Sequence, residues 1–342
     1  DFAFANFDRA AFDYLYYVKN GAEAKINGKS NVIPIDGVNF SKISYIKGLQ
    51  IQPATLSYAL HSRTTLKVGT LSNLVLDVSA ADACGGSYEI IDQYSIANNG
   101  VIESLRFACA STVTAGALKT KKFNSSSLSP EVVSNYKASS SIQSVSFAPN
   151  NAECAVAISF DPGVVGTVLP ICDNMKAEGA PESISGINMV GMFESVSSAN
   201  VVAQSKTRHY VLSRSPDSLV MEVFDTSRLK GLERFFITPI VFKTDDIGTF
   251  SGFGAKIEVK DINCDDKMDI IIKTDRRVVA YLGVSDTSWE PTPKVLFEVP
   301  STDANTTIKK SALWIPDYRS TAGVGVLGIL DNNNNLSLYQ QQ

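Results

Sequence analysis

The sequence predicts an all-β fold built from repeated small antiparallel sheets. Helical amphipathic periodicity is almost absent from the 342 residues. Short runs of β-branched and aromatic residues alternate instead with turns rich in Gly, Pro, Asn and Asp. A unit of strand, loop, strand, tight turn and strand recurs at intervals of about 35 to 70 residues, and this recurrence indicates a repeat architecture.

The clearest copy of the unit is AKIEVKDINCDDKMDIIIKTDRRVVAYLGV, residues 255–284, in which strand patterns flank an acidic loop (residues 261–269). Asp261, Asn263, Asp265 and Asp269 place oxygen-bearing side chains at loop positions one, three, five and nine. A hard cation such as Ca²⁺ takes about six to eight oxygen ligands. The spacing therefore predicts bound Ca²⁺ in a structural role, where it neutralises the acids and fixes the loop.

An EF-hand begins with the same spacing, but it needs a glutamate at position twelve and a helix after it. Position twelve here is Ile272, inside a β-like run of three isoleucines, so the sequence excludes an EF-hand. Asp266 stands where such loops usually have a glycine. Asp tolerates the left-handed backbone conformation better than most residues do, so the loop can still form.

The segment DINCDDKMDIII followed by VVAYLGV resembles the FG-GAP, or VCBS-type, repeat of integrin α-subunit propellers and T-cell immunomodulatory protein-like ectodomains. The loop of that repeat reads D-x-[DN]-x-D-G-x-x-D-[LI]. The resemblance implies a calcium loop at one edge of a β-propeller blade. It further implies side-chain ligation by Asp261, Asn263, Asp265 and Asp269, and ligation by the main-chain carbonyl of Lys267.

Degenerate copies of the unit precede this one along the chain. Residues 2–25 repeat its plan with Asn6, Asp8 and Asp13 in a loop that is one residue short, and we interpret that loop as metal-free. Residues 31–75 contain short β-like runs broken by Gly and Pro. A short helix is predicted at residues 129–136, with Pro130 at its first position.

The later copies complete the prediction of the fold. Asp225, Ser227 and Glu233 occupy positions one, three and nine of the loop template, which makes them the best candidate for a second, degraded ion site. The last strand, residues 336–340, is expected to complete a blade begun near the N-terminus. The repeats predict a single domain, a β-propeller of about seven blades (six to eight), each a four-stranded antiparallel sheet.

Charge and hydropathy exclude several classes of partner. The formal net charge of −4 and the pI of about 5.4 give no basic surface for nucleic acid. Lys119, Lys121 and Lys122 are the only clustered cations, and we interpret them as a solvated strand end. No run of about 18 apolar residues occurs, so no membrane span is predicted within this chain.

The five cysteines lack the C-x-x-C spacing of zinc or thioredoxin-like sites. In an oxidising compartment, the nearest pairings along the sequence are Cys84 with Cys109 and Cys154 with Cys172, and Cys264 is left as a free thiol.

N-glycosylation sequons provide a second indication of compartment. Their asparagines are Asn39, Asn124, Asn305 and Asn335. All four lie in turn-like or Ser/Thr-rich stretches, as expected of surface sites in a secreted protein. With the predicted calcium loop, they indicate an extracellular protein, either secreted or the ectodomain of a membrane protein.

Recognisable catalytic motifs are missing. The two histidines, His61 and His209, lie in strand-like runs without a G-x-S-x-G elbow or a cysteine partner motif. Trp289 and Trp314 could form a sugar-stacking platform, although core packing is more typical of such residues.

Together with the resemblance to FG-GAP propellers, which implies the interaction role, these features predict a non-enzymatic, calcium-stabilised extracellular propeller that binds protein partners, for example in adhesion. One alternative is a carbohydrate-binding propeller or the accessory domain of a polysaccharide-processing enzyme, with glycans as ligands. Another is a structural subunit of an extracellular filament or coat, which would self-assemble.

Overall fold

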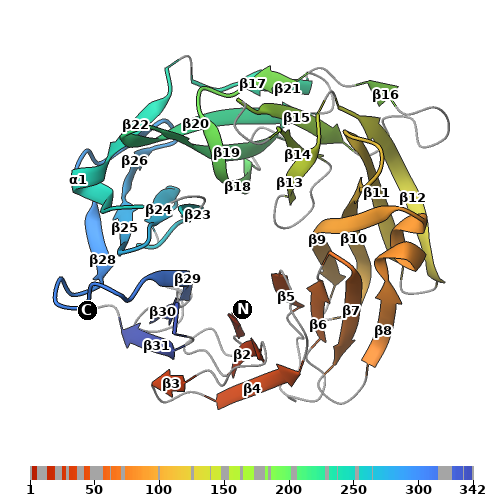
Figure 1. Cartoon of the computed structure of the whole chain (residues 1–342), viewed down its shortest axis with the longest axis horizontal. Helices are drawn as coiled ribbons and strands as arrows, with labels where there is room; N and C mark the ends of the chain where they lie inside the picture. The colour runs from red at the N-terminus through yellow and green to blue at the C-terminus, as the bar shows by residue number, and fades with distance from the viewer. Residues whose placement is uncertain are drawn as a thin grey trace.

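The chain, represented by a computed structural model, has β-strands as its main secondary structure in the described part of the sequence, from Phe2 to Gln340 (Figure 1). Side chains are described, with short gaps, in residues 63–66, 79–92, 106–121, 136–147, 155–171, 186–199, 207–226, 232–313 and 326–339. No helix in the described part of the chain is long and apolar enough to cross a membrane.

The described strands form seven sheets of three to five strands and one separate hairpin. The first two sheets contain β1 (Phe2–Ala5), β2 (Tyr14–Lys19) and β4 (Asn31–Asp36), then β5 (Lys42–Ile46), β6 (Ser57–His61), β7 (Thr65–Thr70) and β8 (Leu74–Ser79). The third sheet contains β9 (Tyr88–Asn98), β10 (Val101–Ser111), β11 (Ala117–Asn124), β12 (Ser127–Lys137) and β16 (Glu182–Ser183). The fourth contains β13 (Ile142–Phe147), β14 (Cys154–Ser159), β15 (Thr167–Cys172) and β17 (Ile187–Asn188).

The second half of the chain continues the series. The fifth sheet contains β18 (Met192–Val201), β19 (Lys206–Ser215), β20 (Ser218–Ser227), β21 (Gly231–Arg234) and β22 (Ile240–Lys243). The sixth contains β23 (Lys256–Lys260), β24 (Asp269–Lys273), β25 (Arg277–Tyr281) and β28 (Lys294–Glu298), and the hairpin is β26 (Gly283–Ser285) with β27 (Ser288–Trp289). The seventh contains β29 (Ile308–Trp314), β30 (Val326–Asp331), β31 (Asn335–Gln340) and β3 (Lys25–Asn27). Among the residues that the structure describes, the helical elements are η2 (Ala81–Gly85), a turn of π-helix, and α1 (Thr244–Ile247).

The sheets follow one another in chain order around a central opening (Figure 1). In the second to seventh sheets, the first strand lies nearest the centre and later strands lie further out, as in a β-propeller. The predicted all-β propeller of mostly four-stranded antiparallel sheets is therefore confirmed. The number of blades stays a prediction, because the first sheet has only three described strands and one of its pairings is parallel.

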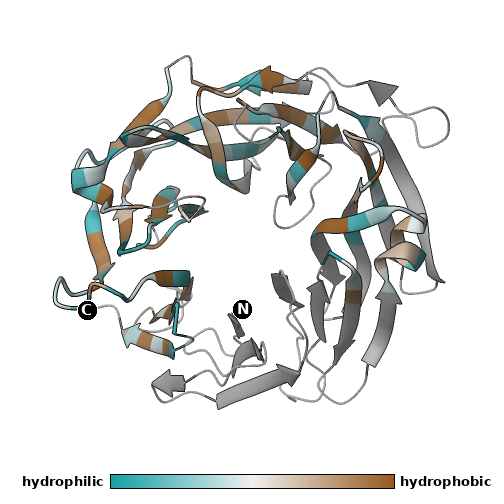
Figure 2. Ribbon diagram, in the orientation of Figure 1, coloured by the Kyte–Doolittle hydropathy of each residue, from teal (hydrophilic) through white to brown (hydrophobic). Residues whose placement is uncertain are grey.

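From the second sheet to the seventh, neighbouring sheets pack face to face, and each cluster of described buried side chains lies between two of them. Strand β24 shows why: Ile270 and Ile272 pack against the fifth sheet, whereas Ile271 packs against the seventh. Side chains alternate between the two faces of a strand, so a strand buried on both faces reads as a continuous apolar run. Figure 2 shows the same concentration of hydrophobic residues along the described strands. Full burial of such a side chain contributes about 1.5–3 kcal/mol relative to exposure.

The two ends of the chain meet in the seventh sheet. Strand β3, from the N-terminal region, pairs in parallel with β31, the last strand, with Ile26 opposite Leu336. The predicted completion of a blade by the last strand is thus confirmed, although the partner strand begins at Lys25 rather than near residue 1. This pairing closes the ring of sheets by main-chain hydrogen bonds.

The predicted helix at residues 129–136 is wrong, because this segment lies in strand β12. The strand pairs with β11, and Pro130 falls within the register shift that separates the Lys122↔Glu131 pair from the Asn124↔Ser127 pair. A proline lacks the N–H that a regular ladder needs, and a bulge is one of the places in a sheet that tolerate it.

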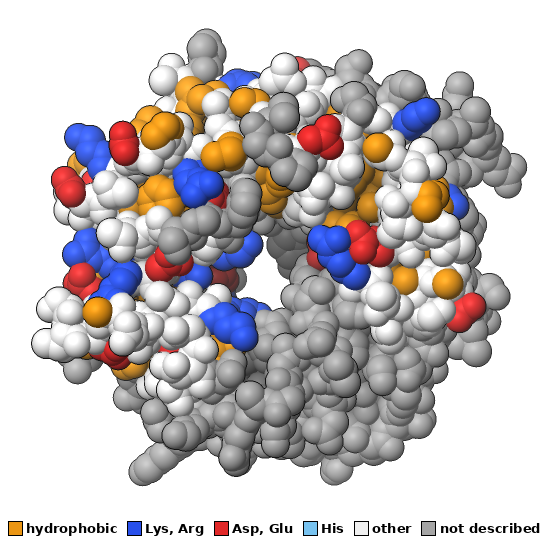
Figure 3. All heavy atoms as spheres, viewed as in Figure 1, with side chains coloured by type: hydrophobic (Ala, Val, Ile, Leu, Met, Phe, Trp, Pro, Cys, Tyr) orange, Lys and Arg blue, Asp and Glu red, His pale blue; other side chains and the backbone are white. Residues whose placement is uncertain are grey.

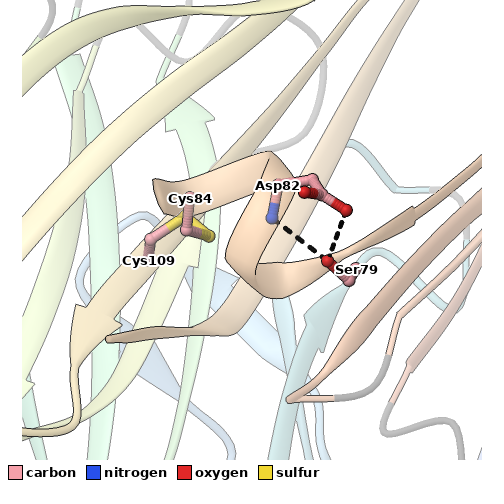
Figure 4. Close-up of a disulfide and its surroundings, with 4 residues drawn as sticks. All are labelled: Ser79, Asp82, Cys84 and Cys109. Carbon is pink, nitrogen blue, oxygen red and sulfur yellow. Dashed lines mark hydrogen bonds between the residues drawn. A yellow bond between two sulfur atoms is a disulfide. The ribbon is translucent and has the colours of Figure 1, made fainter. Parts of the chain in front are cut away.

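Figure 4 shows the disulfide between Cys84 and Cys109, which joins η2 to strand β10. Beside it, the Ser79 hydroxyl donates to Asp82 Oδ2 at 2.6 Å and accepts from the Asp82 N–H at 3.1 Å. The predicted pairing of these two cysteines is confirmed. In the backbone register, Cys154 lies opposite Cys172, but the second disulfide stays a prediction. Cys264 lies outside the described residues.

Candidate functional site: the acidic loop and the central opening

The acidic loop connects β23 to β24, whose facing ends are paired at Lys260 and Asp269. Asp266 has a φ of 63° and is the only non-glycine residue with positive φ in the part of the chain that the structure describes. The left-handed conformation expected at this position is therefore present. It reverses the chain so that the loop returns to the sheet.

Side-chain oxygens in the loop accept hydrogen bonds from its own backbone. Asp261 accepts from the N–H groups of Asp265 and Asp266 at 3.1 and 2.9 Å. The N–H of Asp265 also donates to Asn263 Oδ1 at 3.3 Å, and that of Lys267 donates to Asp265 Oδ1 at 3.0 Å. These contacts fold the oxygens toward the loop backbone, as in loops stabilised by Asx turns.

Asp269 differs from the other acids because it is fully buried at the start of β24. Its two carboxylate oxygens accept from the N–H of Ile262 at 2.7 Å and from that of Gly283 at 2.6 Å. Burial raises the pKa of Asp269, the two hydrogen bonds lower it, and the nearby charges of Asp261 and Asp265 raise it again. Like charges disfavour the ionised form of a carboxyl group, so Asp261 and Asp265 act on the pKa of Asp269 in the same direction as burial.

The donor set is chemically suited to Ca²⁺, because it consists of carboxylate, amide and main-chain oxygens on one short loop. The Lys267 ammonium lies 3.6 Å from Asp265 Oδ2 and neutralises part of this charge. Among the described residues, no three His, Cys, Asp or Glu side chains converge in the arrangement of a metal site. Ligation by Asp261, Asn263, Asp265, Lys267 and Asp269 stays a prediction.

The second candidate ion site is wrong at its first position. Asp225 does not begin a loop but lies within strand β20, where its carboxylate pairs with the Arg208 guanidinium at 2.9 Å. Both side chains are buried, and the arginine supplies the positive charge that the sequence pattern assigned to an ion. Ser227 is the last residue of β20, and Glu233 lies in β21 opposite Asp225.

The described sequons differ in their surroundings. Asn305 is exposed in the loop before β29. Asn335 is half-buried at the start of β31, and its Nδ2 donates to Asp331 Oδ2 at 2.9 Å. The side chains of Asn39 and Asn124 lie outside the described residues, so glycosylation at all four positions stays a prediction.

His209 is fully buried between the fourth and fifth sheets. Its Nδ1 lies 2.6 Å from Ser198 Oγ and its Nε2 lies 2.7 Å from Thr226 Oγ1. Ser198 Oγ is in turn 2.8 Å from Ser146 Oγ. Burial lowers the pKa of His209 to about 3, so the ring is neutral at physiological pH. The side chain of His61 lies outside the described residues.

Trp289 is packed rather than presented as a platform. Its ring meets Tyr210 and Phe236 edge-on, with centroid distances of 6.4 and 6.1 Å. Its Nε1–H donates to the main-chain carbonyl of Met268 at 2.8 Å. The packing role expected of this residue is confirmed, whereas the side chain of Trp314 lies outside the described residues.

The molecule is hollowed at its centre, with Lys and Arg side chains around the opening in this view (Figure 3). A cavity of about 380 Å³ is lined by the inner strands β9, β13, β18 and β23, with polar side chains from Asp92, Ser144, Ser146, Glu194, Ser195 and Lys256. Burial raises the pKa of Glu194 to about 7, although Arg214, Lys256 and the Ala255 amide lower it. Sequence reasoning missed this cavity, because its residues come from four distant strands and share no motif.

No protein-family model and no curated protein matches the sequence. Similar solved structures include BBS1N in complex with ARL6DN, with 8% identity, a TM-score of 0.49 and coverage of 88% of this chain and 77% of that chain. Another is the β-propeller domain of Nup133 from Vanderwaltozyma polyspora, with 7% identity, a TM-score of 0.45 and coverage of 88% and 82%. At these values the likeness carries no argument about function, and the propeller assignment rests on the sheets themselves.

Proposed function

We propose that this chain is an extracellular, non-enzymatic β-propeller that binds protein partners, in adhesion or a related context, and is stabilised by Ca²⁺. A β-propeller is consistent with a protein-interaction module, because its rigid sheets present loops on two faces. The observation that carries the calcium part is the acidic loop, with its oxygen donors in sequence and Asp266 in the left-handed conformation.

Three points support the extracellular part of the proposal. The Cys84–Cys109 disulfide is typical of proteins from oxidising compartments. Extracellular calcium is also abundant enough for a loop of modest affinity, since extracellular modules bind Ca²⁺ with dissociation constants of about 10⁻⁴ to 10⁻³ M. The exposed Asn305 sequon suits the same compartment.

The non-enzymatic part is supported by the position of His209. Its ring is buried and neutral, and both ring nitrogens lie within hydrogen-bond distance of hydroxyl groups in the sheet interior. A general base must reach its substrate proton, and this imidazole cannot do so without opening the packed sheets.

A bead-adhesion assay tests the interaction proposal. Beads coated with the folded protein are added to cultured cells in millimolar Ca²⁺ or in chelator, beside beads coated with Asp265→Ala or with the control Asp217→Ala. We expect Ca²⁺-dependent attachment for the native protein and the control, and loss of that dependence for Asp265→Ala. Protease treatment of the cells removes their surface proteins. Bead attachment that is unchanged after this treatment would overturn the protein-partner part of the proposal.

The same preparations separate the two alternatives. Binding to a glycan array that free sugar inhibits would favour the carbohydrate-binding propeller, which would need surfaces other than Trp289. Concentration-dependent growth in light scattering would favour a filament or coat subunit. We expect neither result.

A further inference from the structure

The central cavity takes its lining from four inner strands in ring order. These strands are β9, β13, β18 and β23, which belong to the third, fourth, fifth and sixth sheets. The volume of about 380 Å³ falls within the range of about 300–1,000 Å³ that is typical of small-molecule sites in proteins. The cavity is therefore large enough for a small organic ligand, and the chemistry of its lining decides which kind.

Three charged side chains belong to this lining, but only one of them is exposed. The Glu194 side chain is fully buried, with Arg214 Nε 3.3 Å from its Oε1. Asp92 is 7% exposed and already has an interaction within the protein. Lys256, in contrast, is exposed. A ligand that enters the cavity therefore meets one accessible charge, and that charge is positive.

The Lys256 ammonium has no close counter-ion. Among the described residues, no hydrogen bond or ion pair holds its Nζ, and its attractive charge partner is Glu194. The surrounding protein displaces part of its water, which lowers the pKa of Lys256, and the charge of Glu194 raises it. Burial raises the pKa of Glu194 to about 7, so this carboxylate compensates Lys256 only in part at neutral pH. A ligand anion would supply the missing negative charge.

A serine hydroxyl adds a second donor beside Lys256. Ser195 lines the cavity, and its Oγ accepts from the N–H of Ile257, the residue after Lys256, at 3.3 Å. This bond uses a lone pair of the hydroxyl, so the Ser195 proton is left to donate. The two donors therefore lie at the same end of the cavity, on β18 and β23. A carboxylate can accept from both of them, because it has two oxygens.

Apolar side chains make up much of the remaining wall. They come from three strands, and they are Ile91, Val145, Phe193 and Val196. Such a surface favours a ligand with an apolar body, because contact removes apolar area from water on both sides. A single ammonium also balances a single negative charge. A carboxylate therefore matches the cavity better than a phosphate monoester, which carries about −1.5 to −2 at neutral pH.

We propose that the central cavity binds a small organic carboxylate, whose charged group lies on Lys256 and Ser195 and whose apolar body packs against Val145, Phe193 and Val196. This site is separate from the acidic loop and does not depend on Ca²⁺. It goes beyond the proposed binding of protein partners, because it assigns the interior of the ring to a small molecule.

Three probes that share a phenyl group and differ in the head group test the charge preference. They are 3-phenylpropanoate with a carboxylate, 3-phenylpropanamide with a neutral amide and 3-phenylpropylamine with an ammonium. Calorimetry and saturation-transfer NMR measure their binding to the native protein in chelator at neutral pH. We expect the carboxylate to bind about tenfold more tightly than the other two. Equal or tighter binding of the amide or the amine would overturn the proposal, and so would absence of binding by all three.

Substitutions locate the bound carboxylate. Lys256→Met removes the ammonium, and Lys243→Met on the exposed end of β22 is the matched control. Ser144→Phe places a ring in the cavity, which Ser144 lines from β13. We expect about tenfold weaker binding of 3-phenylpropanoate by Lys256→Met, loss of binding by Ser144→Phe and no change in the control. Lys256→Arg keeps the charge and should restore most of the affinity.

Unchanged binding by Lys256→Met, or an equal loss in Lys243→Met, would overturn the proposal, because the anion would then lie elsewhere on the surface. Circular dichroism and the melting temperature show whether each variant is folded. If a cavity variant fails to fold, the comparison of the three probes on the native protein still decides.

Discussion

Arg208 and Asp225 lie directly opposite each other in β19 and β20 and form a buried ion pair. The Nε and Nη2 groups of Arg208 donate to the two carboxylate oxygens at 2.9 and 3.3 Å. The Phe235 ring covers the guanidinium, with its centroid 3.5 Å away. Each side chain of the pair is only 4% exposed. Neither charge can therefore be solvated if its partner is removed.

Replacement of Asp225 alone should be strongly destabilising. We expect Asp225→Ala to lower the free energy of unfolding by about 3–5 kcal/mol, because it leaves an uncompensated guanidinium in the interior. The double variant Arg208→Met/Asp225→Leu should lose much less, since it removes both charges and keeps apolar volume. Denaturant unfolding measures both, and the exposed Asp217→Ala serves as a control with an effect within about 0.5 kcal/mol. A loss below about 1 kcal/mol for Asp225→Ala would contradict the buried pair.

Arg276 organises the loop between β28 and β29. Its guanidinium donates to the carbonyls of Asp303 at 2.9 Å and Pro300 at 2.8 Å, and to three further carbonyls of the same loop at 3.2 to 3.5 Å. A lysine ammonium cannot reproduce this planar fork of donors. We expect Arg276→Lys to cost about 2 kcal/mol and to speed hydrogen exchange in residues 299–307.

The matched control for Arg276 is Arg63→Lys. Arg63 pairs with Glu89 at 2.7 Å, but its side chain is 59% exposed. An exposed pair of this kind contributes about 0–1 kcal/mol, so its replacement should change stability little. Equal effects of the two substitutions would show that the five carbonyl contacts of Arg276 contribute no more to stability than one exposed ion pair does.

The fold was predictable because both faces of each central strand are buried. In a run such as Ile270 to Ile272, successive apolar side chains point to both faces of the strand, so neither face is polar. The short length of such a run between turns excludes a helix. The conformation of the acidic loop was predictable for a local reason: the left-handed Asp266 and the inward-turned oxygens depend on residues a few positions apart. Local chemistry of this kind is readable from a single sequence.

Long-range contacts were harder to predict. The β19–β20 turn determines the Arg208–Asp225 pair. Ser215 and Ser218 are paired at the turn, and counting seven residues away from the turn along each strand reaches Arg208 and Asp225. That register makes Asp225 a strand residue and excludes it from a loop. Nothing in the sequence places Trp289 on Met268 or brings Glu194 to the central cavity, since these contacts join separate sheets. The strand at Pro130 depends on a bulge that propensity does not reveal.

Glu194 should make stability fall as pH rises through the mildly acidic range. Burial raises its pKa from 4.5 to about 7. Arg214, Lys256 and the Ala255 amide lower the pKa, and Asp275 raises it slightly. Below about pH 4.5, the carboxyl is protonated in both states. Between pH 4.5 and 7, the unfolded chain ionises while the folded protein keeps the proton, so folding becomes less favourable by up to about 3 kcal/mol.

The variant Glu194→Gln isolates this contribution, because the amide does not titrate. Unfolding free energies are measured for both proteins between pH 4.5 and 7.5, and their difference removes the contributions of the other carboxylates. We expect the native protein to lose stability relative to the variant across this window. A difference that is independent of pH would show that Glu194 ionises normally in the folded protein.

The Cys84–Cys109 disulfide should stabilise the protein by restricting the unfolded chain. The two cysteines are 25 residues apart, and closing a loop of this length contributes about 3–4 kcal/mol in the chain-entropy model. We expect Cys84→Ala/Cys109→Ala to lower the free energy of unfolding by about that amount. Reducing conditions should lower the free energy of unfolding of the native protein, because they break this disulfide. In the double variant, they should cause no further loss from this pair.

Thiol counting in denaturant tests the second pairing. Cys154 and Cys172 are directly opposite in neighbouring antiparallel strands, where Cα atoms lie about 4.5–5.5 Å apart, within the range that a disulfide bridges. We expect one reactive thiol per chain, from Cys264, after expression in an oxidising compartment. Three thiols would mean that Cys154 and Cys172 stay reduced there, and that the first disulfide alone stabilises the chain. In that case Cys154→Ala should change the free energy of unfolding by the same amount under oxidising and under reducing conditions, because a cysteine that forms no disulfide contributes only its packing.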